Sequence, residues 1–123
     1  MIPYPVYKLI HLLGVFFVLG SLAGLAIYTA NGGTKSKNSM KRVTAILHGI
    51  GMFLVLLGGF GMLARTGITG ALPGWVWAKL VIWVVFGVLI AFVAKGPLLA
   101  KVIWFLLPFL TVFSAYIAIM RPI

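Results

Sequence analysis

Two histidines and one lysine lie inside long apolar stretches of the sequence, and their side chains could bind a ligand or take part in a reaction. They are His11, His48 and Lys79. Ionisable side chains are expensive in the interior of a bilayer, so residues placed there are candidates for function. A neutral imidazole is a common axial ligand of haem iron, and a cation such as Lys79 can hold a propionate of the ring. These residue types therefore predict a site for haem b, with His11 and His48 as candidate iron ligands.

Each of these residues also has a purely structural interpretation. A histidine that donates a hydrogen bond to a backbone carbonyl of a neighbouring helix would only specify packing. Lys79 could instead extend to the lipid headgroups beside Trp75 and Trp77. Copper binding by both histidines is a further alternative, although the sequence spacing gives no compact site with the methionines Met40, Met52 and Met62.

The composition excludes most catalytic sites. The chain has no Asp, no Glu and no Cys, while ten Lys and Arg residues give it a net charge of +10. Carboxylate acid–base pairs, Ser-His-Asp triads, hard-cation sites and thiolate sites are therefore ruled out. The cations lie singly near helix ends and form no continuous basic face, so we expect anionic lipid headgroups as partners and no nucleic acid.

The elements that must position the candidate residues are membrane helices. Of the 123 residues, 63% are hydrophobic and only 8% are charged, and the mean hydropathy is +1.23. Four apolar stretches are each long enough to cross a bilayer, which takes about 20 residues. The sequence predicts helices at 4–28, 43–64, 75–94 and 98–120. Because the connections are short, we expect a single all-α domain, an up-down-up-down four-helix bundle.

The distribution of Lys and Arg predicts how the bundle is oriented. The side with the first and third connections holds six of them, and the other side holds four. Since the cytoplasmic side carries the excess, both termini are expected outside, which means the periplasm for a bacterial inner membrane. The six are Lys35, Lys37, Lys41, Arg42, Lys95 and Lys101, and the four are Lys8, Arg65, Lys79 and Arg121.

The predicted spans also set the depth of each candidate. His11 lies near the outer end of the first helix, whereas His48 lies near the inner end of the second. At 1.5 Å per residue they are separated by roughly 10–15 Å along the membrane normal. Two histidines on one iron usually lie closer in depth than this. Lys79 is expected nearly level with His11.

Two stripes of polar or small residues run along the first two helices, and we expect them to face each other or to share a cavity. Small residues let helices approach closely in a bilayer. The glycines could serve packing alone, or they could leave a groove for a flat ligand. The stripes are Tyr7, His11, Gly14, Ser21 and Tyr28, and Lys41, Thr44, His48, Gly51, Gly58 and Arg65; Gly20 and Gly24 add a GxxxG spacing.

Two short motifs resemble those of the HemJ-type protoporphyrinogen oxidase, CopD and SirB-like group of small membrane haem proteins. The segment KLIHLLG, residues 8–14, resembles the start of that group's first helix, and WVWAKL, residues 75–80, resembles an element that opens a later helix. The resemblance implies a four-helix membrane bundle, haem b bound through His11, and an important role for Lys79. His48 is not part of either motif.

The preferred hypothesis is a small membrane protein that binds haem b for electron transfer, for oxidation of a lipophilic or porphyrin substrate, or for haem handling. The sequence does not decide whether it is an enzyme. The alternative is a non-catalytic accessory or scaffold subunit, either as a homodimer or with an acidic membrane-protein partner that supplies the missing carboxylates. A transporter is a weaker alternative, because four short spans would have to dimerise to enclose a path.

Overall fold

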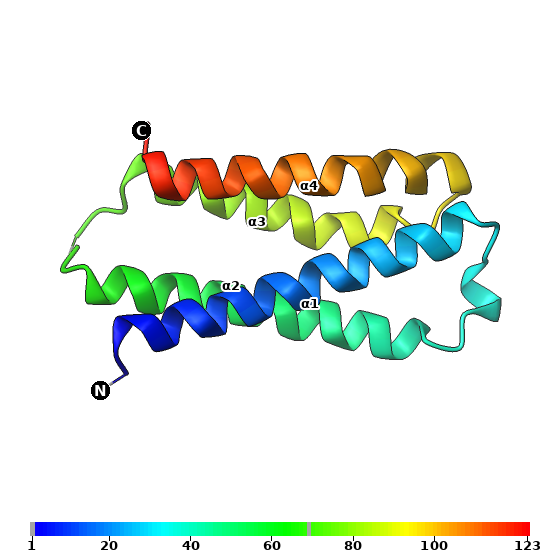
Figure 1. Cartoon of the computed structure of the whole chain (residues 1–123), viewed down its shortest axis with the longest axis horizontal. Coiled ribbons are helices and arrows are strands. Elements are labelled where there is room, and N and C mark those ends of the chain that lie inside the picture. Colours follow the sequence, from blue (N-terminus) through cyan, green and yellow to red (C-terminus); the bar gives the residue numbers. More distant parts are fainter. Residues whose placement is uncertain (1, 69) are drawn as a thin grey trace.

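Four long helices make up most of the structure, a computed structural model that describes residues 2–68 and 70–123. They are α1 (Tyr4–Ala30), α2 (Lys41–Arg65), α3 (Gly74–Phe92) and α4 (Pro97–Met120), with the short 3-10 helix η1 (Lys35–Lys37) between α1 and α2. Consecutive helices run antiparallel, so both termini and the α2–α3 connection lie at one end of the bundle (Figure 1). The predicted all-α class and four-helix arrangement are confirmed for this part of the chain.

Each of the four helices is long and apolar enough to cross a membrane. Their lengths are 27, 25, 19 and 24 residues. Large apolar side chains also cover the outside of the bundle, where Phe16 is 69% exposed and Phe109 is 74% exposed. In water such a surface would be unfavourable, whereas in lipid it is the expected one. The fold is that of a multi-pass membrane protein.

The helix ends lie within two residues of the predicted boundaries. The first helix extends to Ala30, and the backbone N–H of Asn31 closes its last turn on the carbonyl of Ile27. The third helix ends at Phe92, two residues before the predicted end at Ala94. Hydropathy alone cannot place such ends, because the apolar run continues past the last helical turn.

The four helices do not pack equally closely. The contact between α1 and α2 is the most extensive, followed by the contacts of α4 with α1 and α3, whereas α2 and α3 meet sparsely. The buried apolar cluster lies mainly between α1 and α4; its members are Val18, Leu22, Ala26, Val93, Ile103 and Leu107. The two helix pairs α1–α2 and α3–α4 are thus joined chiefly through α1 and α4.

Candidate functional site

His11 lies in a close contact between α1 and α2. Its main chain rests directly on Gly58 of α2, where an added Cβ would come within 2.6–2.7 Å of the backbone N, Cα and Cβ of His11. One residue further on, Gly59 lies beside the ring, because a Cβ there would be 3.7 Å from His11 Nδ1. The imidazole is therefore seated against helix backbone, since Gly58 and Gly59 carry no side chain.

The same close contact continues along both helices. Gly14 and Gly51 meet backbone to backbone, since a Cβ on Gly14 would lie 2.8 Å from the Gly51 carbonyl oxygen, and a Cβ on Gly51 would lie 2.8 Å from that of Gly14. The Tyr7 ring packs on Gly61. The two predicted stripes thus face each other in this half of the bundle. The spacing of three and four residues brings one helix face into register with its neighbour.

The GxxxG pair of α1 does not take part in this packing. A Cβ added at Gly20 or Gly24 would have no heavy atom within 4 Å among the described residues. Both glycines are exposed. The close approach of α1 to α2 uses Gly14 instead, so the spacing of two glycines did not indicate which face of the helix packs.

A hydrogen bond to α2 holds the His11 ring. Its Nδ1 lies 2.9 Å from the carbonyl oxygen of Val55. A carbonyl oxygen can only accept, so Nδ1 carries the hydrogen and donates it. In a neutral ring this leaves the lone pair on Nε2. Metal-binding histidines commonly show this arrangement, in which one ring nitrogen donates to a backbone carbonyl and the other binds the metal.

Lys79 lies near the start of α3 and is half-buried. Because α1 and α3 both start at the end of the bundle that holds the N-terminus, Lys79 is nearly level with His11, as expected from the sequence. One turn along α3, the indole N–H of Trp83 donates to the carbonyl of Met52 on α2 at 2.9 Å. Trp83 therefore ties the helix that carries Lys79 to the helix that holds the His11 ring.

His48 lies elsewhere in the bundle. It is 5% exposed, and its Nε2 is 3.1 Å from the carbonyl oxygen of Phe86 on α3. Along α2 it precedes Val55 by seven residues and Gly58 by ten, which places it about 10–15 Å from the level of His11. The structure places His11 and Lys79 in the halves of α1 and α3 that lie nearest the termini, and it places His48 in the opposite half of α2.

His11 offers the free ring nitrogen that an axial haem ligand needs, and Lys79 is a cation at a similar depth. Sequence reasoning named Gly59 only as one of the glycines that let helices pack closely, and it did not single out Val55 or Trp83. No cluster of three or more His, Cys, Asp or Glu side chains occurs in the described ranges. One pocket lies between α1 and α4 and another between α3 and α4, and neither is lined by His11, His48 or Lys79.

Comparisons with known proteins do not assign the chain to a family. No family model matches it, and no curated protein or solved structure shows a significant match. The function must therefore be argued from the residues themselves.

Proposed function

We propose that this chain is a membrane protein that binds haem b through Nε2 of His11. The observation that carries the proposal is the hydrogen bond from Nδ1 to Val55, because it leaves the lone pair on the other nitrogen of a neutral ring. The glycines beneath the ring hold its main chain against α2. An iron ligand needs a fixed ring and a defined tautomer, and this arrangement supplies both.

Lys79 is the residue to pair with a propionate. It comes from α3, lies nearly level with His11 along the bundle, and has no carboxylate side chain anywhere in the sequence as a partner. His48, which bonds to Phe86, is assigned to helix packing and not to the iron.

When bound, a haem supplies one-electron iron chemistry. The residues of the chain would set the position of the ring, exclude bulk water through the surrounding apolar side chains, and neutralise a propionate. These roles suit electron transfer, oxidation of a lipophilic or porphyrin substrate, or haem handling. In a bacterium the protein would lie in the inner membrane with both termini in the periplasm, as the excess of cations at the other end favours.

The test is the absorption spectrum of protein expressed with added haem, before and after dithionite. The wild type should show a Soret band that shifts on reduction, and His11→Ala should lose it. His48→Ala is the matched control, because it removes an imidazole bonded to a backbone carbonyl on the same bundle, and it should keep the band. Loss of the band in His48→Ala alone would contradict the assignment.

A second candidate is an accessory subunit without a cofactor. One observation favours it: Gly20 and Gly24 are exposed, with open space beside them among the described residues. Under this proposal the histidines specify packing and another membrane helix covers the glycines. A protein that stays colourless after haem is added, and that copurifies with a stoichiometric membrane partner, would favour this candidate over haem binding.

A further inference from the structure

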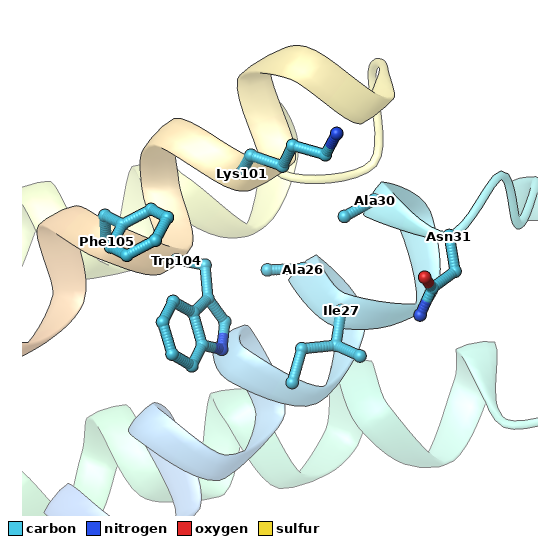
Figure 2. Close-up of a pocket in the computed structure, with 7 residues that line it drawn as sticks. All are labelled: Ala26, Ile27, Ala30, Asn31, Lys101, Trp104 and Phe105. Atoms are coloured by element: carbon cyan, nitrogen blue, oxygen red, sulfur yellow. The ribbon is translucent and has the colours of Figure 1, made fainter.

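A groove at the opposite end of the bundle from the termini lies between the last turns of α1 and the first turns of α4. Its volume is about 180 Å³. Ala26 and Ala30 leave room along α1, and Ile27 and Trp104 form apolar walls. In Figure 2 the Trp104 ring lies beside Ile27, and both belong to the same depression. A depression with this lining is suited to an acyl chain.

Polar groups lie at the same groove. Lys101 of α4 and Asn31, which follows the last residue of α1, complete the lining, and Lys101 is exposed. Figure 2 shows the Lys101 side chain extending from α4 toward the part of α1 that carries Ala30. An ammonium therefore stands beside an apolar depression, close to the ends of two membrane-spanning helices.

The chain offers no anion for this ammonium. It contains no Asp and no Glu. The loops and helix ends at the same side of the bundle add further cations, which are Lys35, Lys37, Lys41, Arg42 and Lys95. The counter-charge at this end must come from another molecule. Basic pockets between membrane helices are known binding sites for anionic lipid headgroups.

We propose that this groove binds one anionic phospholipid. Its phosphate would pair with Lys101, the Asn31 amide would donate to a headgroup oxygen, and an acyl chain would lie along Ala30, Ile27 and Trp104. The depth agrees, because helix ends and Trp side chains are found at the level of the headgroups. The inference needs only a bilayer around the chain and is independent of haem binding at His11.

Native mass spectrometry of the detergent-solubilised protein tests the proposal, with phosphatidylglycerol and phosphatidylcholine of identical acyl chains added separately. One tightly bound phosphatidylglycerol is expected. Lys101→Gln should weaken it about fivefold relative to the wild type, the effect of one cation near an anionic headgroup. Lys35→Gln is the matched control, since it removes an equal charge at the same end from a residue outside the groove, and it should change binding much less.

Two further experiments distinguish binding of the whole lipid from binding of its phosphate group alone. Ala30→Leu should reduce phosphatidylglycerol binding by filling the groove while every charge is kept, and inorganic phosphate should not displace the bound lipid. Equal binding of the two lipids, equal effects of Lys101→Gln and Lys35→Gln, no effect of Ala30→Leu, or displacement by phosphate would each overturn the proposal. A melting curve of each variant shows whether it is folded.

Discussion

The Nδ1 atom of His11 lies 2.9 Å from the carbonyl oxygen of Val55. This bond joins α1 to α2, orients the imidazole and determines which ring nitrogen holds the proton. It is also compatible with either interpretation of the residue, because a histidine that only packs and a histidine that binds iron can both donate to a backbone carbonyl. Helix packing and cofactor binding therefore have to be measured separately, with different variants.

Gly58 and Gly59 form a matched pair for testing the packing. Gly58→Ala should destabilise the protein by about 1–3 kcal/mol, the typical cost of overpacking, because its Cβ would meet backbone atoms of His11 at 2.6–2.7 Å. Gly59→Ala should have little effect, because its Cβ would lie in ordinary contact with the ring at 3.7 Å. Thermal unfolding in detergent measures both. Equal melting temperatures for the two variants would disprove the close approach of α1 to α2.

Trp83→Phe tests the hydrogen bond between α3 and α2. The phenyl ring retains most of the packing but cannot donate to the Met52 carbonyl. We expect a loss of about 0.5–1.5 kcal/mol in the free energy of unfolding. Trp77→Phe is the control on the same helix, because Trp77 is 58% exposed, and its melting temperature should stay near that of the wild type. A larger loss in Trp77→Phe than in Trp83→Phe would refute this role for Trp83.

Lys79→Met and Lys79→Arg test the cation. Methionine retains the apolar part of the side chain and removes the charge, so haem affinity should fall by about tenfold or more, as expected for a hydrogen bond to a charged group. Arginine keeps the charge and should retain most of the affinity. Haem titration followed by Soret absorbance gives both constants. If Met and Arg bind haem equally well, Lys79 does not pair with a propionate.

Cysteine labelling tests the orientation, and the absence of native Cys makes it straightforward. A cysteine at Ser36, in the connection between α1 and α2, should be protected from a membrane-impermeant maleimide in intact cells. A cysteine at Gly70, in the connection between α2 and α3, should be labelled. The reverse pattern would place both termini in the cytoplasm and contradict the expectation from the positive charges.

Much of the fold could be predicted because lipid imposes a simple length requirement on each span. The pairing of His11 and Gly14 with glycines of α2 was also predictable, because their helical spacing places them on one stripe. The roles of Gly20 and Gly24 were not, since a small residue does not specify which neighbour it faces. The hydrogen bond of Trp83 was missed for a related reason. In an apolar helix, a tryptophan that bonds to the next helix has the same sequence signal as one that faces lipid.

The central claim is that Nε2 of His11 binds haem iron, and replacement of the side chain by free imidazole tests it most directly. His11→Gly should bind haem weakly and lack the Soret spectrum of the wild type. Millimolar imidazole should restore that spectrum in the variant while leaving the wild type unchanged. A His11→Gly protein that binds haem with the wild-type spectrum in the absence of imidazole would contradict the account.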